Sequence, residues 1–417
     1  MQGKIYVDSE IGRLKGVVIH TPGTEVENMT PKNAERALYS DILNLKVATR
    51  EYNQLSGVLG KVAQTWEVSD LLRTSLENYE ARKELIIRAS GNDTLIRSRL
   101  EEYNSSELTK VLIEGELLRR DNLTRYLSKE KFALRPLHNF FFTRDSSMVI
   151  NDSVLIGSMA SRVRQREAMI MKTIFRYHPQ LRGDTHETGR GPGECTKCTI
   201  EGGDLLMARK DIVIIGNGCR TTTEGIDSLI DIICHHKSDK FHIIVQELPY
   251  TPESFIHLDM VFTLLDRDNF MAYEPLILKK SRYQTVHIEI DNGKVSSIRD
   301  EISLPSALKS LGMDMEPVIC GGVRDPWIQE REQWHSGANF FAIAPGKLLG
   351  YSRNEYTLEE MSGQGYEILK ADDVISGKSD PESYKRCVIG IDGSELSRGG
   401  GGARCMTMPF SREPVTI

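Results

Sequence analysis

The sequence predicts a mixed α/β fold in which one strand-rich unit is repeated. Residues 144–157 and 203–216 share an order of acidic residue, strand, turn, second strand and glycine, and weaker copies begin at His257 and Asn339. The intervals between the copies leave room for one helix each, for example at 164–177. Repeats of one such unit form a solenoid or close into a propeller-like ring. In a ring, the matched ends of the units face one axis, so acidic residues at matched positions would share one pocket.

The N-terminal third of the chain predicts where this repeat starts and where it is interrupted. Residues 16–20 form a short β-branched run that ends at a Thr-Pro-Gly turn, and apolar residues recur at helical spacing over 37–62. Residues 71–132 lack proline and are rich in leucine, glutamate, arginine and lysine, which predicts a set of helices. We therefore expect the first unit over 1–70, an inserted helical domain over 71–132, and the remaining units over 133–417.

The composition is that of an ordinary globular protein and disfavours several partners. The 417 residues include 53 basic and 59 acidic side chains, so no basic field favours nucleic acid or an anionic membrane. No apolar segment approaches the ~18 residues that span a bilayer, and the first residues lack the apolar core of a signal peptide. We therefore expect a cytoplasmic protein whose seven cysteines remain thiols.

A glycine-rich segment near the C-terminus suggests that one cysteine is delivered to a ligand. Gly399 to Gly402 give a backbone that can approach a ligand more closely than side chains would permit, and Cys405 follows shortly after. Glycine runs also bind phosphate, but no Gly-Lys-Ser/Thr sequence follows here. A single cysteine is more often a small buried apolar residue, so its interpretation depends on polar residues upstream.

Four acids and one histidine stand at or beside the matched positions of the repeat. These residues are Asp145, Glu201, Asp204, His257 and Asp259. Burying a carboxylate without a partner costs several kcal/mol, so converging acids need a cation between them. Each acid alone could be a turn residue, and a lone histidine on an apolar strand is commonly a core residue. His257 and Asp259 are two residues apart, which on the predicted strand points both to one face and makes His257 a candidate base for a thiol.

The cation that best fits these residues is a guanidinium group. The acids and histidine lack a metal-ligand spacing such as His-x-x-x-His, and Cys195 and Cys198 have no second Cys/His pair at zinc-finger spacing. We therefore predict no metal, and a polar loop at the cysteine pair. A guanidinium presents N–H donors in one plane, which two carboxylates can bind in bidentate fashion. The residues thus suggest a thiol that attacks a bound guanidinium, and they disfavour a thiol protease because carboxylates do not suit an amide oxyanion.

Five blocks of sequence, taken in order, resemble the arginine deiminase family. They are residues 139–145, 201–204, 257–262, 331–334 and 403–409. Five blocks in sequence are far more specific than any single one, and the resemblance runs from the first strand to the C-terminus. It implies a five-unit ββαβ pseudo-symmetric propeller, with an inserted helical domain between the first and second units.

The resemblance also implies a catalytic role for each of five residues. Cys405 would be the nucleophile and His257 the general acid and base. Asp145, Glu201 and Asp259 would bind the guanidinium or orient His257.

Further positions would bind the substrate, and one of them departs from the family pattern. The implied substrate-binding residues are Asn139, Arg164, Asp204, Arg220, Arg398 and Arg404. Of these, Asn139, Arg164 and Arg220 resemble the residues that hold the substrate's α-carboxylate, although each could also be an ordinary surface or turn residue. Some members carry a gating arginine where this chain has Gly400, and Arg398 or Arg404 would have to replace it.

The activity implied by the resemblance is hydrolysis of free L-arginine to L-citrulline and ammonia, without metal or organic cofactor. A homodimer or homotetramer is expected, since oligomers are common among enzymes of this size. Three alternatives stay open on the same fold: an amidinotransferase, a methylarginine hydrolase and a catalytically silent arginine-binding protein.

Overall fold

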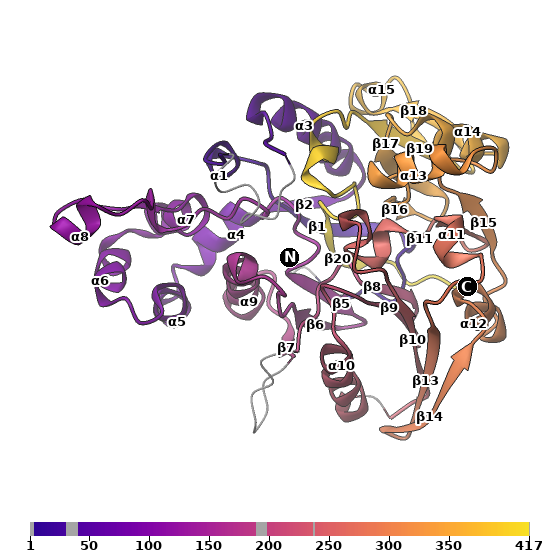
Figure 1. Ribbon diagram of the computed structural model, residues 1–417, viewed down its shortest axis with the longest axis horizontal. Coiled ribbons are helices and arrows are strands. Elements are labelled where there is room, and N and C mark those ends of the chain that lie inside the picture. Colours follow the sequence, from indigo (N-terminus) through magenta and orange to yellow (C-terminus); the bar gives the residue numbers. More distant parts are fainter. Residues whose placement is uncertain (1–3, 31–40, 189–197, 237, 417) are drawn as a thin grey trace.

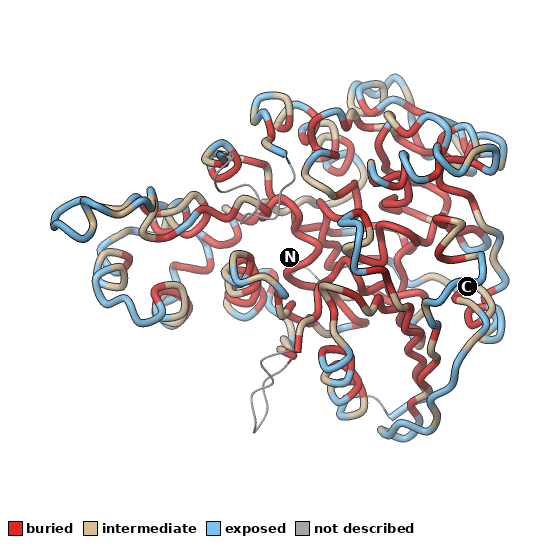
Figure 2. The backbone as a smooth tube through the Cα atoms, in the orientation of Figure 1, coloured by how far each residue is buried: buried red, intermediate tan, exposed pale blue. Residues whose placement is uncertain are grey.

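The described part of the chain, residues 4–30, 41–188, 198–236 and 238–416, forms small mixed sheets surrounded by helices in the computed structural model (Figure 1). Its strands make six sheets, of which five have three or more strands. Buried backbone concentrates in the middle of the molecule, where the strands gather, and exposed residues lie mostly on the outer helices and loops (Figure 2). The predicted mixed α/β class is confirmed.

Each of the five larger sheets contains the same three-stranded motif. Two strands pair antiparallel, and a third pairs parallel with the second one after a helical connection. The five motifs are β20 (Met408–Arg412), β1 (Leu14–Ile19) and β2 (Gln64–Glu67); β5 (Ser147–Ile150), β6 (Ser153–Ile156) and β7 (Asp184–Glu187); β8 (Leu205–Arg209), β9 (Ile212–Asn217) and β10 (Phe241–Glu247); β11 (Phe262–Leu264), β12 (Asn269–Ala272) and β15 (Glu316–Ile319); and β16 (Phe341–Ala344), β17 (Lys347–Tyr351) and β19 (Cys387–Ile391).

The remaining strands extend two of these sheets or form a small ribbon. The hairpin of β13 (Thr285–Asp291) and β14 (Lys294–Glu301) continues the sheet beyond β10, and β18 (Glu367–Lys370) pairs with β19. A two-stranded ribbon joins β3 (Glu116–Leu117) and β4 (Phe132–Leu134). The hairpins predicted from the sequence repeat are confirmed, including the two weaker copies.

The connecting helices are amphipathic and bury one face. In α3, Ala48, Tyr52, Leu55 and Leu59 recur every three or four residues and are all buried, so they lie on one side of the helix. The side chain of Asn44 caps its first turn by accepting a hydrogen bond from the backbone N–H of Val47. The helices of the repeated motifs are α3 (Leu45–Val62), α9 (Gln165–Tyr177), α10 (Thr223–His236), α12 (Leu304–Ser310) and α14 (Glu355–Gly363).

The segment predicted as inserted helices is largely helical. Its helices are α4 (Val68–Ser75), α5 (Tyr79–Ser90), α6 (Thr94–Glu102), α7 (Ser105–Glu114) and α8 (Leu123–Tyr126), of which α5 to α8 extend away from the sheets on the left of Figure 1. Asparagine or aspartate side chains cap α5 to α8, and Asn104 and Glu107 form a capping box at α7. Leu100, Leu108 and Leu112 are buried, whereas Leu95, Leu117, Leu123 and Leu127 are exposed, so burial accounts for only part of the leucine content.

Short helices complete the fold. They are α1 (Thr24–Glu27), α11 (Glu274–Ile277), α13 (Pro326–Trp334) and α15 (Ala371–Ile375), with 3-10 turns η1 (Arg162–Arg164), η2 (Glu253–Phe255), η3 (Leu258–Met260), η4 (Pro381–Ser383) and η5 (Leu396–Gly399). Among the described residues, no helix is both long enough and apolar enough to cross a membrane.

The cysteines differ in part from the prediction. Cys219, Cys234, Cys320, Cys387 and Cys405 are free thiols as expected. Cys198 is disulfide-bonded, so the prediction that all seven cysteines are thiols is wrong for this residue. Cys195 and the loop expected around it lie outside the described residues.

A buried carboxylate of α3 holds the loop that leads into the glycine-rich segment. Glu51 is fully buried, and its two oxygens accept hydrogen bonds from the backbone N–H groups of Ser394, Glu395 and Leu396 at 2.9 to 3.1 Å. The hydroxyl of Ser394 also donates to Glu51. One side chain from the N-terminal part of the chain therefore satisfies several loop donors that would otherwise be buried without a partner.

Replacing Glu51 by alanine is expected to lower the free energy of unfolding by about 2–4 kcal/mol, because it leaves buried backbone donors unpaired. Glu51→Gln should cost less, since it retains one acceptor oxygen. Urea unfolding midpoints measure the effect, with exposed Glu77→Ala as the control. Equal midpoints for Glu51→Ala and the control would contradict this account of the loop.

Candidate active site

Cys405 lies in a buried network organised by Asn339. The Asn339 side-chain oxygen accepts hydrogen bonds from the backbone N–H groups of Arg404, at 2.9 Å, and Cys405, at 3.2 Å. Its side-chain nitrogen donates to the Cys405 sulfur at 3.2 Å and to the backbone oxygen of Asp259 at 3.1 Å. Cys405 is only 3% exposed, so this amide fixes the position of a sulfur shielded from bulk water.

Asn339 is a site residue that the motif search did not select. It stands two residues before β16, as Asp145 stands two residues before β5. A strict alignment of the repeat could therefore have found it. This copy of the repeat carries an amide where the copy at Asp145 carries an acid.

Asp259 is the acid next to the sulfur. Its carboxylate oxygens lie 3.7 and 3.8 Å from the Cys405 sulfur. Burial, together with the negative charges of Asp259 and Asp145, raises the pKa of the Cys405 thiol well above its usual range. The empty site therefore keeps the sulfur protonated at neutral pH.

His257 lies between two acids. Its Nε2 is 2.9 Å from Glu201 Oε2, and its Nδ1 is 3.6 Å from Asp145 Oδ1. Burial disfavours the charged imidazole, but Asp145, Glu201 and Asp204 outweigh it and raise the pKa of His257 to about 9. The histidine is thus a cation at neutral pH and can donate a proton.

The backbone at His257 differs from the predicted strand. His257 is itself extended, with φ -139° and ψ 158°, but a 3-10 turn, η3, begins at the next residue. Hydrogen bonds from the backbone N–H of Leu258 to Asp204 Oδ1, at 2.9 Å, and of Asp259 to the oxygen of Gly203, at 3.2 Å, hold this turn. The strand prediction is wrong because these contacts, which the local sequence does not reveal, favour a turn.

Asp204 holds the backbone that directly follows His257. One of its carboxylate oxygens accepts a hydrogen bond from the Leu258 N–H. Burial raises the pKa of Asp204 to about 7. Gly203 beside it has to be glycine, because a Cβ there would lie 2.4 Å from Nδ1 of His257.

Two buried arginines neutralise the acids. Arg404 binds Asp259 Oδ2 at 2.8 Å and both oxygens of Glu10 at 3.0 and 3.1 Å. Arg164 binds Asp145 Oδ2 at 2.6 Å and Glu167 Oε2 at 2.8 Å. Each guanidinium joins two carboxylates from different segments, so the acids are buried as ion pairs.

The other predicted binding residues lie at different distances from this cluster. Arg220 approaches Glu201 Oε1 to 3.9 Å, and the backbone oxygen of Asn139 accepts a hydrogen bond from Arg164 at 3.4 Å. Arg398 lies apart from both, at the half-exposed turn η5, where it pairs with Asp41 and, at 3.2 Å, with Glu395.

Gly400 directly follows η5. Its φ of +83° lies in the left-handed region that favours glycine, and a Cβ there would meet no atom of the described residues within 4 Å. Glycine in place of an arginine therefore suits the local conformation.

Two polar atoms in the site retain unused hydrogen-bonding capacity. Among the described residues, neither Asp145 Oδ1 nor His257 Nδ1 has a hydrogen-bond partner, although both atoms are buried. Buried polar atoms without partners are rare in folded proteins. The Asp145 oxygen therefore suits a ligand that brings hydrogen-bond donors and positive charge, whereas the protonated Nδ1 of His257 can only donate.

A divalent metal fits this position less well than an organic cation. Ligand atoms of Asp145, Glu201 and His257 do lie within 4.8 Å of one another. However, the guanidinium of Arg164 is 2.6 Å from Asp145 and 3.9 Å from Glu201, and would repel a metal ion held by the same carboxylates. A planar cation can instead use the outward-facing oxygen of Asp145.

Comparison with known proteins identifies the family. Residues 35–412 match the arginine deiminase family. The chain belongs to the arginine deiminase family. It is 32% identical to an arginine deiminase of Streptococcus agalactiae and 30% identical to one of Clostridium perfringens, with 98% or more of this chain and 98% of each relative covered. The resemblance read from the five sequence blocks is confirmed.

Solved structures support the fold of this arginine deiminase family member. An amidinotransferase of the saxitoxin pathway from Microseira wollei matches with a TM-score of 0.56 at 11% identity, covering 99% of this chain and 98% of that one. A dimethylarginine dimethylaminohydrolase matches with a TM-score of 0.51 at 15% identity, covering 95% and 100%. At these identities the likeness concerns the fold alone.

The charge on His257 can be tested directly. Glu201→Gln removes the negative partner 2.9 Å from Nε2, so the pKa of His257 should fall from about 9 toward 6.5. NMR titration of labelled histidine measures it. Glu332→Gln is the control for loss of a buried carboxylate elsewhere, since Glu332 of α13 accepts hydrogen bonds from the first turn of α14.

This pKa also fixes the sign of a stability effect. Because folding raises the pKa of His257, its ionisation stabilises the folded protein fully below pH 6.5, and this contribution is lost as the pH rises through about 9. An unchanged His257 titration in Glu201→Gln would contradict the assigned contact.

Proposed function

We propose that this protein hydrolyses free L-arginine to L-citrulline and ammonia through a covalent intermediate on Cys405. The family and its full-length relatives named arginine deiminase support this reaction. The observation that carries it is the convergence of the Cys405 sulfur, Asp259, Asp145 and His257 in one buried cluster. A guanidinium carbon placed there meets a nucleophile, two carboxylates and a proton donor together.

The carboxylates hold the cation and orient its carbon toward the sulfur. Asp145 uses the oxygen that faces away from Arg164, and Asp259 acts from beside Cys405. Guanidinium is a poor electrophile because its charge is spread over three nitrogens. Fixed carboxylates localise that charge and strengthen their contacts in the tetrahedral adduct, which lowers the barrier.

The substrate itself helps to ionise the nucleophile. Burial and two acids raise the pKa of Cys405 in the empty site, and a bound guanidinium offsets those negative charges. The thiolate therefore forms when arginine is present. This arrangement protects an otherwise reactive sulfur from other electrophiles.

The reaction proceeds in two displacements with the same histidine. The sulfur attacks the guanidinium carbon, and His257 protonates the departing nitrogen, so that ammonia leaves and an amidino-thioether remains on Cys405. Neutral His257 then takes a proton from water, which attacks the same carbon. The carbon–sulfur bond breaks, citrulline leaves, and the thiol and imidazolium are restored.

The amino-acid end of the substrate is bound by polar residues around the cluster. The proposed α-carboxylate ligands are Asn139, Arg164 and Arg220. In this structure the Arg164 guanidinium binds Asp145 and Glu167, so it contributes its positive charge from within those ion pairs. Arg398 remains a candidate gate near Gly400, and a raised KM for arginine in Arg398→Ala would support this role. Arg404 is better described as a positioning residue, because its guanidinium is buried between Glu10 and Asp259.

The architecture proposed for this activity is a five-unit ββαβ propeller, with units in 1–70 and 133–417 and an inserted helical domain in 71–132. Five sheets with one shared topology support it, as does the likeness to the solved structures. A cytoplasmic location and assembly as a homodimer or homotetramer stay predictions.

Cys405→Ser is expected to abolish release of citrulline and ammonia while retaining arginine binding, because a hydroxyl is far less nucleophilic than a thiolate. Coupled ammonia detection measures turnover, and calorimetry measures binding. Cys234→Ser, at a free thiol on α10 outside the site, is the matched control and should keep full activity. Substantial turnover by Cys405→Ser would remove Cys405 from its role.

A further inference from the structure

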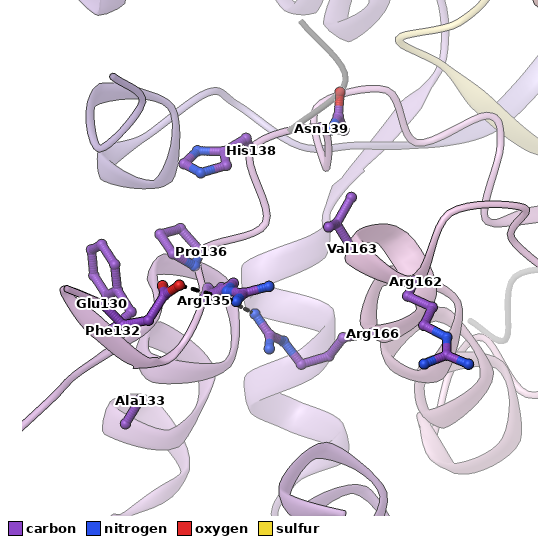
Figure 3. A pocket seen from close by; sticks show the side chains of 10 residues that line it. All are labelled: Glu130, Phe132, Ala133, Arg135, Pro136, His138, Asn139, Arg162, Val163 and Arg166. Carbon is purple, nitrogen blue, oxygen red and sulfur yellow. Dashed lines mark hydrogen bonds and ion pairs between the residues drawn. The ribbon is translucent and has the colours of Figure 1, made fainter. Parts of the chain in front are cut away.

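A second cavity lies beside the active site, between the segment Glu130–Asn139 and the start of α9 (Figure 3). Its volume is about 420 Å³, within the range of roughly 300–1,000 Å³ that small-molecule pockets occupy. Cys405, His257 and the acids around them do not line it. The cavity therefore needs an explanation separate from the reaction chemistry.

Positive charge dominates this cavity. Arg135, Arg162 and Arg166 line it, and Glu130 is the one acidic residue among the described residues that do (Figure 3). The whole chain carries a net charge of -6, so the positive charge of this cavity is opposite in sign to that of the protein as a whole. His138 adds an imidazole that can also donate a hydrogen bond.

The three guanidinium groups have N–H donors that their contacts with the described residues do not use. The Arg162 side chain is exposed and makes no hydrogen bond or ion pair with the described residues. The Arg135 side chain has, among the described residues, a long contact of 3.4 Å to Glu130. Arg166 donates from Nε to the oxygen of Leu112, at 2.9 Å, and from one terminal nitrogen to the oxygen of Arg135, which leaves its other terminal nitrogen for a ligand.

Of the three arginines, Arg166 would be stabilised most in its charged form by a bound anion. Burial lowers its pKa to about 10, since little protein charge compensates for the water it has lost. Desolvated guanidinium groups bind oxyanions strongly through planar, charge-assisted hydrogen bonds.

The cavity also has an apolar side. Phe132, Pro136 and Val163 line it together with the arginines. An inorganic ion would leave this surface uncovered, whereas a ligand with an apolar or aromatic body would bury it. L-Arginine lying wholly within the cavity is a poor fit, because its guanidinium would lie among three others.

We propose that this cavity is a binding site for a small organic phosphate, whose phosphate contacts Arg135, Arg162 and Arg166 and whose apolar body packs on Phe132 and Pro136. The site adjoins that of the substrate without including Cys405 or His257. Asn139, placed above at the α-carboxylate, also lines the cavity, and Arg162 and Val163 immediately precede Arg164, which binds Asp145.

Isothermal titration calorimetry tests this proposal with two probes, AMP and inorganic phosphate. Wild-type protein should bind both, and AMP more tightly, because only AMP covers the apolar side. The double variant Arg135→Gln/Arg162→Gln should weaken AMP binding by about tenfold or more, since charge-assisted hydrogen bonds are lost. The double variant Arg73→Gln/Arg324→Gln, which removes two exposed arginines outside the cavity, should bind as wild type does.

Several results would overturn the proposal: no binding of AMP to the wild type, phosphate binding as tight as AMP, or equal AMP affinity in the two double variants. A raised KM for L-arginine in Arg135→Gln/Arg162→Gln with unchanged AMP affinity would also overturn it, because the arginines would then serve the substrate. The calorimetry needs no turnover, so its result is independent of the proposed arginine hydrolysis.

Discussion

The pairing of buried carboxylates with buried guanidinium groups is the constraint on which the rest of the structure depends. Arg404 joins Glu10 to Asp259, and Arg164 joins Asp145 to Glu167, so each arginine ties together segments that are distant in sequence or belong to different elements. Removing either partner would leave a buried charge uncompensated, which costs several kcal/mol. These ion pairs allow acids from separate sheets to meet around one cysteine.

The same electrostatics explains how an unreactive thiol becomes a nucleophile. Arg164 binds one oxygen of Asp145. The other oxygen of Asp145 and Nδ1 of His257 make no hydrogen bond among the described residues. In the empty site the net effect on Cys405 is to hold its proton. A cation that enters the site reverses this effect, and binding and activation become one event. No separate conformational change is needed to activate the thiol.

Much of this could be predicted from the sequence, because the repeat and the charged residues are local signals. The hairpins, the amphipathic helices and the acids near Cys405 follow from periodicity and residue type. The 3-10 turn after His257 could not be predicted, since it depends on hydrogen bonds to Asp204 and Gly203. Glu10 was missed for a similar reason: its partner Arg404 is 394 residues away, and no local pattern marks the pair.

The most direct test of the central claim is intact-mass spectrometry after L-arginine is mixed with the protein and quenched with acid within one turnover. The account predicts a species heavier by arginine minus ammonia, with the added mass on the peptide that contains Cys405. Protein that turns over arginine but carries no added mass at any quench time, or carries it on a different residue, would contradict the account.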